Sequence, residues 1–145
     1  MQKQTRRCRV RLLEDRGTDG RFQKSGIFAD CLNFPMGLVW RDGKLYVADR
    51  SNKRIQIFTP DGDFLGQWTG MGGPNDITRG TDGNFYIAEQ EDDGKPAQVC
   101  VRDGQGNVLA RIESRHVHGV GVDSRGDIYA GLTQDRSVDK FVRVT

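Results

Sequence analysis

The fold is decided by a phrase that occurs three times along the chain. It reads MGLVWRDGKLYVA at residues 36–48, NDITRGTDGNFYIA at residues 75–88 and HGVGVDSRGDIYA at residues 118–130. The glycines at 43, 83 and 126 are 40 and 43 residues apart, and a tyrosine follows each of them three positions later. A fixed period in this range is typical of repeated units that stack on one another. The sequence therefore predicts three copies of one supersecondary unit.

Each unit is expected to hold short antiparallel strands. An apolar strand is followed by a turn rich in Asp and Gly and then by a strand with aromatic and β-branched residues, which indicates a hairpin. Residues 54–58 and 63–68 supply a third and fourth strand in the first unit, and residues 98–101 and 107–112 do so in the second. Four antiparallel strands form a propeller blade. We therefore predict an all-β fold, a β-propeller segment of about three four-stranded blades.

The chain is expected to form one domain, because 145 residues are too few for two ordinary ones. The third unit has no segment for a fourth strand after residues 140–144. Residues 7–12 alternate polar and apolar side chains, so we expect them to form an outermost strand that completes the last blade and protects its edge. The predicted parts are an N-terminal outer strand and linker at 1–31 and three blades at 32–69, 70–113 and 114–145.

Three blades are too few to close a ring, because propellers usually have about four to eight. One interpretation is a two-fold homodimer, a six-bladed ring in which each N-terminal strand completes the third blade of the other chain. A complementary half-propeller is the other partner of this kind. The rival interpretation is a truncated fragment of a longer gene product, which predicts exposed apolar flanks.

Composition and charge exclude several classes of protein. The net charge of +2, from 22 basic and 20 acidic residues, is too balanced to favour nucleic acid as a partner. The sequence has no apolar run of the length that a membrane span requires, and its first 13 residues lack the apolar core of a signal peptide. Cys8, Cys31 and Cys100 are too far apart for a metal knuckle, so we expect reduced thiols. We expect a soluble cytoplasmic protein.

The phrase also resembles a known family. FPMGL at residues 34–38, followed by LYVADRSNKRIQIF at residues 45–58, resembles an NHL repeat, and the resemblance extends over residues 34–144. HGVGVDSRGDIY at residues 118–129 and KFVR at residues 140–143 resemble the last blade of bacterial six-bladed NHL proteins, relatives of the peptidyl-α-hydroxyglycine α-amidating lyase domain. The resemblance implies the C-terminal half of a six-bladed propeller.

The same resemblance bears on catalysis. In the lyase family, histidines near the start of three blades bind zinc, and an arginine after an Ala-Asp step positions a carboxylate. Arg50 matches this arginine and His118 matches one zinc ligand, but Met36 and Asn75 stand at the comparable positions of the other blades. A catalytic zinc needs three protein ligands. We therefore expect no cofactor and no catalytic residues. Zinc bound by His118, or calcium, is expected only if the protein is an enzyme.

Four residues are candidate ligand contacts on the loop face of the blades. Arg50, in the loop after the second strand, either binds an anion through its planar guanidinium or makes a surface ion pair. A histidine at the axial end of a blade contacts a metal or a ligand, or it is hydrogen-bonded within the channel. Asp49 and Glu89 occupy equivalent places in two blades, but paired loop carboxylates without a known separation do not indicate acid–base chemistry. The candidates are Arg50, Asp76, Glu89 and His118.

The function that these patterns favour is a non-catalytic propeller scaffold. It would bind a protein, a peptide or a small polar or anionic ligand on its loop face, an inference that rests partly on the fold. Two alternatives remain open. One is a zinc- or calcium-dependent lyase or lactonase-like hydrolase, and the other is a truncated fragment without independent function.

Overall fold

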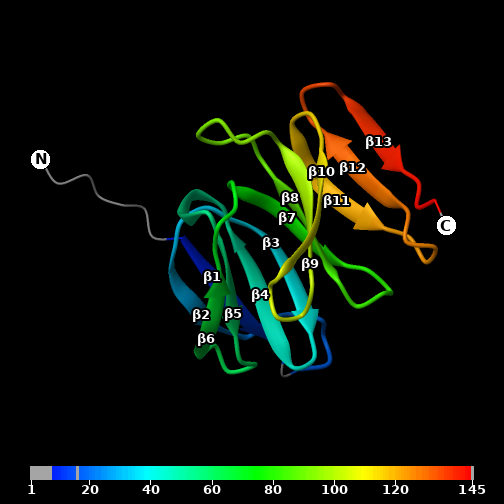
Figure 1. The fold of residues 1–145 in the computed structure, drawn as a ribbon. Coiled ribbons are helices and arrows are strands. Elements are labelled where there is room, and N and C mark those ends of the chain that lie inside the picture. Colours follow the sequence, from blue (N-terminus) through cyan, green and yellow to red (C-terminus); the bar gives the residue numbers. More distant parts are fainter. Residues whose placement is uncertain (1–7, 16, 145) are drawn as a thin grey trace, which may run out of the picture.

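The computed structural model describes residues 8–15 and 17–144, which form strands joined by turns and one short 3-10 turn. Figure 1 shows three sheets side by side, preceded in sequence by a hairpin. The first sheet contains β3 (Pro35–Arg41), β4 (Lys44–Asp49), β5 (Arg54–Phe58) and β6 (Phe64–Trp68). The second contains β7 (Pro74–Arg79), β8 (Phe85–Glu89), β9 (Gln98–Arg102) and β10 (Val108–Glu113). The third contains β11 (Val117–Val122), β12 (Ile128–Leu132) and β13 (Ser137–Phe141).

The neighbouring strands of each sheet are antiparallel and follow one another in chain order. The innermost strands β3, β7 and β11 contact one another from sheet to sheet, as the inner strands of successive propeller blades do. The prediction of an all-β partial propeller is therefore confirmed. Among the described residues no fourth strand pairs with β13, as the pattern of the third unit predicted.

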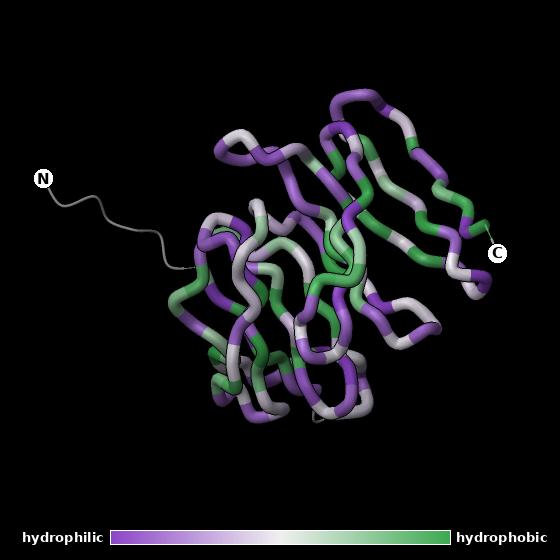
Figure 2. The backbone as a smooth tube through the Cα atoms, viewed as in Figure 1, coloured by the Kyte–Doolittle hydropathy of each residue, from purple (hydrophilic) through white to green (hydrophobic). Residues whose placement is uncertain are grey.

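Each predicted Asp-Gly turn joins the first two strands of a blade. Gly43, Gly83 and Gly126 have φ angles of 72°, 85° and 86°, the left-handed region in which glycine has no steric penalty. The turns are mostly hydrophilic, and the hydrophobic residues lie mainly on the strands, where they alternate with polar ones, as the colours of Figure 2 show. No helix among the described residues is long and apolar enough to cross a membrane.

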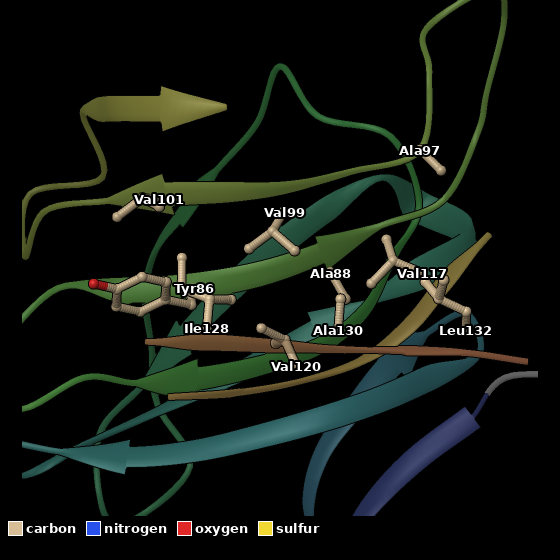
Figure 3. Close-up of a cluster of buried hydrophobic side chains, with 10 residues drawn as sticks. All are labelled: Tyr86, Ala88, Ala97, Val99, Val101, Val117, Val120, Ile128, Ala130 and Leu132. Carbon is tan, nitrogen blue, oxygen red and sulfur yellow. The ribbon is translucent and has the colours of Figure 1, made fainter. Parts of the chain in front are cut away.

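The blades are held together by apolar clusters between neighbouring sheets. Between the first two blades, Tyr46 and Trp68 pack against Phe85 of the second blade. Between the second and third blades, Tyr86, Ala88, Val99 and Val101 face Val117, Val120, Ile128, Ala130 and Leu132 (Figure 3). Ala88 and Ala130 are fully buried, and their small side chains allow the sheets to approach closely.

The N-terminal segment forms a hairpin that covers one flank of the first blade. β1 (Cys8–Glu14) pairs with β2 (Lys24–Leu32), and Ala29 and Leu32 pack against Val47 and Phe58. The prediction that the N-terminal strand completes the last blade is wrong within one chain, and a strand stands where a linker was expected. The physical reason is that Val47 and Phe58 need a cover, which the adjacent segment supplies by folding back on itself.

The third blade ends the array with an uncovered flank. Tyr129, Gly131 and Val138 stand at the repeat positions that Tyr46, Ala48 and Ile55 occupy in the first blade. Val138 is 64% exposed, whereas Ile55 is fully buried by the next blade. The hairpin and the third blade lie at opposite ends of the molecule in Figure 1. One end of the array is therefore covered by the chain itself, and the other is open.

Candidate functional site

A polar cleft of about 520 Å³ lies where loops of all three blades meet. The first blade contributes Arg50, in the 3-10 turn η1 (Arg50–Asn52) that follows β4. The second contributes the start of β7 and the acidic loop after β8, and the third contributes the entry to β11 and the turn after β12. The lining residues are Arg50, Asn75, Gln90, Glu91, Asp92, Asp93, Gly94, His116, Val117, His118, Thr133 and Gln134.

The turn η1, which contains Arg50, is held in place by the side chain of the preceding residue, Asp49. This carboxylate is fully buried. Its Oδ1 accepts the Asn33 N–H at 2.7 Å, and its Oδ2 lies 2.8 Å from Nε of Arg54. The side-chain amides of Asn52 and Gln56 donate to the same Oδ2 at 2.9 and 3.0 Å. Four hydrogen bonds from three segments, the loop before β3, η1 and β5, hold the backbone immediately before Arg50 in one conformation.

Arg50 itself is held at the edge of the cleft by the first two blades. Its Nε donates a 2.9 Å hydrogen bond to Oε1 of Gln90, and its guanidinium lies 5.4 Å from the centroid of the Phe34 ring. Stacking on a ring and bonding to an amide orient a guanidinium without neutralising its charge. The cleft therefore contains an oriented positive charge.

Asn75 and His118 begin the inner strands of the second and third blades. Asn75 is 5% exposed, and its Nδ2 donates to the Val117 carbonyl at 3.0 Å. Its Oδ1 is buried and accepts no hydrogen bond from the described residues. Buried polar atoms usually have partners, so this oxygen departs from the usual pattern. His118 is half-buried beside it, and His116 is exposed.

The acidic loop after β8 forms another part of the cleft wall. Nζ of Lys53 lies 2.6 Å from Asp92 Oδ2 and 3.1 Å from Asp93 Oδ2. These hydrogen bonds, first to Asp92 and then to Asp93, raise the pKa of Lys53. The loop is thereby tied to the turn that carries Arg50. Glu91 is exposed on the same wall, so the cleft presents both signs of charge.

The structure separates the four predicted ligand contacts into two pairs. Arg50 and His118 both line the cleft, but Asp76 and Glu89 do not. Asp76 accepts the backbone N–H of Val120 at 3.0 Å. Glu89 is 2% exposed, and Gln98 Nε2 donates to it at 2.8 Å. These two carboxylates support the strands that surround the cleft.

Ten of the twelve lining residues were not predicted as ligand contacts, among them Asn75, Gln90 and His116. The repeat contains the signal for one of them, because Gln90 follows Glu89 as Arg50 follows Asp49. Asn75 stands at the repeat position of a histidine ligand of the lyase family, but only the structure shows its unpartnered oxygen. His116 has Phe34 and Gly73 at the equivalent positions of the other blades, so the repeat contains no signal for it.

The donor atoms near the axis do not fit the zinc that the lyase resemblance implies. His118 has Asn75 and Met36 at the equivalent positions of the other two blades, and neither replaces an imidazole as a zinc ligand. Within residues 8–15 and 17–144, no three His, Cys, Asp or Glu side chains gather in a way that could hold a metal ion.

A family model described as a domain of unknown function (DUF7133) matches residues 1–130. The chain belongs to the DUF7133 family. It is 30% identical over 112 residues to human NHL repeat-containing protein 3, a match that covers 69% of this chain and 32% of the human protein. This DUF7133 chain thus spans about a third of the length of its curated relative. The resemblance to NHL repeats is confirmed.

Solved structures show the same fold. The WD40 β-propeller domain of Doa1 matches 86% of this chain and 42% of its own length, with a TM-score of 0.64 and 20% identity. Luciferin-regenerating enzyme matches 74% of this chain and 40% of its own length, with a TM-score of 0.58 and 17% identity. The DUF7133 chain is therefore an NHL-type β-propeller segment, and its ligand contacts remain predictions.

Proposed function

We propose that this chain is a non-catalytic propeller scaffold that binds a polar ligand with a carboxylate, a short peptide or a small molecule, in the cleft of Arg50 and His118. The observation that carries the proposal is the oriented guanidinium of Arg50 on the rim of a cleft whose wall contains a buried acceptor without a partner. Asp76 and Glu89 act behind this surface, since they hold the strands that position it.

The cleft suits a ligand with two kinds of polar group. A guanidinium fork matches a carboxylate, with which it forms charge-assisted hydrogen bonds. The Asn75 Oδ1 needs a donor, and an N–H two or three bonds away from the carboxylate is what a peptide terminus supplies. The cleft volume of about 520 Å³ lies within the range of about 300–1,000 Å³ that is common for ligand pockets.

The test is isothermal titration of the 145-residue chain with N-acetyl-trialanine and with its C-terminal amide. The free acid is expected to bind and the amide to bind at least about tenfold more weakly, because a hydrogen bond to a charged group contributes about 1.5–3 kcal/mol. Arg50→Gln should weaken binding of the acid to the level of the amide. Arg79→Gln is the matched control, because Arg79 is exposed at the far end of β7.

The proposal fails if the acid and the amide bind equally, or if Arg50→Gln and Arg79→Gln have the same effect. The enzyme alternative, a zinc- or calcium-dependent lyase or hydrolase, is separated by equilibrium dialysis with each metal. One tightly bound ion per chain would support that alternative. The donor set beside His118 leads us to expect none.

We also propose that two copies form a six-bladed ring, in which the third blade of each meets the hairpin of the other. The open flank of the third blade supports this, because Val138 is 64% exposed at a position that is buried in the other blades. Light scattering after size exclusion should give twice 16.3 kDa. Val138→Asp should return the monomer, whereas Leu65→Asp, on an exposed outer strand, should not. If the wild type is monomeric, the homodimer is excluded. The remaining interpretations are then a different partner that supplies a complementary half-propeller, or a fragment of a longer gene product.

A further inference from the structure

The two interfaces between blades are built from equivalent positions with different residues. The ladders of the first two blades pair Ile55 with Trp68 and Val99 with Ile112, so Ile112 is the counterpart of Trp68. Phe85 follows the turn glycine of the second blade by two positions, and Ile128 follows that of the third blade by two positions, so Ile128 is the counterpart of Phe85. Arg41 has Thr81 as its counterpart two positions before that glycine. The second interface thus has smaller side chains at all three places.

The first interface is filled by these large side chains. The Trp68 ring lies 5.3 Å from the Tyr46 ring and 5.1 Å from the Phe85 ring, between centroids. The Arg41 guanidinium lies 5.1 Å from the centroid of Phe85 and donates to the Gly83 carbonyl. A Cβ added to Gly106 would lie 2.3 Å from Trp68 Nε1, which shows how closely the next turn covers the indole.

Among residues 8–15 and 17–144, the equivalent space in the second interface is hollow. A cavity of about 380 Å³ opens between the second and third blades. Its apolar wall includes Ile112 and Ile128, the counterparts of Trp68 and Phe85. The outer strand β10 forms its rim. The principal wall residues are Tyr86, Val101, Leu109, Ile112, Ile128 and Phe141. A cavity of this kind with apolar walls favours an apolar guest over water.

The mouth of this hollow carries charge. The Tyr86 hydroxyl donates to Asp82 Oδ2 at 2.8 Å, and the amide of Asn84 donates to the same atom at 2.9 Å. Asp82 is therefore already engaged by the protein. Arg143 also lines the hollow, and its side chain is exposed. Arg143 is the cation at the mouth of the hollow, and its charge interacts with that of Asp82.

We propose that this hollow between the second and third blades is a binding site for a planar aromatic carboxylate of about the size of an indole. The ring lies between Tyr86, Ile112 and Ile128, in the space that Trp68 and Phe85 fill in the first interface, and the carboxylate meets Arg143. The site is distinct from the Arg50 cleft, since none of its lining residues belongs to that cleft.

The experiment uses indole-3-acetate and indole as probes of the 145-residue chain, with titration calorimetry. Indole-3-acetate should bind more tightly than indole. Ile112→Trp, which introduces the side chain that the repeat uses at position 68, should lower the affinity at least tenfold. Leu65→Trp is the matched control, because Leu65 is 51% exposed on β6, and it should leave the affinity unchanged.

A second pair of measurements avoids dependence on one variant. In the wild type, nuclear Overhauser effects should connect the indole protons to the methyl groups of Ile112 and Ile128. Arg143→Gln should weaken indole-3-acetate and leave indole unchanged. The proposal is overturned if neither probe binds at millimolar concentration, if the contacts map to other residues, or if Leu65→Trp lowers the affinity as much as Ile112→Trp does.

Discussion

Asp76 links the inner strands of two neighbouring blades, because its Oδ2 accepts the backbone N–H of Val120 at 3.0 Å. Its Oδ1 accepts the N–H of Ile77 on its own strand at 2.9 Å. Both oxygens therefore face backbone groups. Gly37 of the first blade lies close on the other side, where an added Cβ would be 3.0 Å from Asp76 Oδ1. The carboxylate is thus part of the contact among the three inner strands.

Asp76→Ala is expected to destabilise the protein without changing the chemistry of the cleft. Loss of the acceptor leaves a partly buried N–H without its partner, which costs about 1–3 kcal/mol in the free energy of unfolding. Urea denaturation measures this value. Asp61→Ala, an exposed aspartate in a turn, is the control and should change it by less than about 0.5 kcal/mol. If Asp76→Ala keeps its stability but loses the ligand, Asp76 is a binding residue.

Asp49 and Glu89 occupy equivalent positions, but their hydrogen bonding differs. Both oxygens of Asp49 are bonded, whereas Oε1 of Glu89 has no partner among the described residues. Asp49→Asn should lower the free energy of unfolding by about 3 kcal/mol, because it breaks a buried ion pair with Arg54. Glu89→Gln should cost less than about 1 kcal/mol, because it keeps the acceptor for Gln98. Equal losses in the two variants, measured by urea denaturation, would contradict this assignment.

Two glycines of one turn should respond differently to the same substitution. Gly106 has φ of +89°, and an added Cβ would lie 2.3 Å from Trp68 Nε1, whereas a Cβ at Gly104 would meet open space. Gly106→Ala should lower the free energy of unfolding by about 1–3 kcal/mol through crowding and strain. Gly104→Ala should have little effect. Thermal melts of both variants test this, and a normal melt for Gly106→Ala would show that Trp68 moves freely.

Much of the fold could be predicted from the repeat, because its signals are local. The turn glycines need positive φ, and the tyrosines after them pack between blades, so both recur at a fixed spacing. Tyr46 and Tyr86 are 5% and 4% exposed. Tyr129 at the same position is less buried, because no described blade follows it. The number of blades and the short third blade follow from the same period.

The hairpin and part of the site could not be predicted in this way. Residues 24–32 contain Gly26 and several polar side chains, and their strand conformation depends on burial of Ala29 and Leu32 against Phe58. Strand propensity depends strongly on such tertiary contacts. Similarly, Asp76 and Arg50 both stand near loops, but only the three-dimensional arrangement shows that one carboxylate bonds backbone while the guanidinium lines the cleft.

The stability of the protein at high pH depends on the ionisation of Tyr86. Burial, assisted by the hydrogen bond to Asp82, raises the pKa of Tyr86 from 10.0 to about 12. Since the folded state holds the phenol proton more tightly than the unfolded state, Tyr86 contributes stability that is complete below pH 10 and is lost as the pH rises from 10 to about 12.

Tyr86→Phe removes this titration and should make the free energy of unfolding fall less steeply over that interval. Urea denaturation at a series of pH values measures the slope, and absorbance of phenolate near 295 nm follows ionisation directly. Asp82→Asn should lower the pKa of Tyr86 only part of the way, because burial is the larger cause. Identical slopes for the wild type and Tyr86→Phe would mean that the hydroxyl is open to solvent, and the polar edge of the hollow beside it would then be wider than the structure shows.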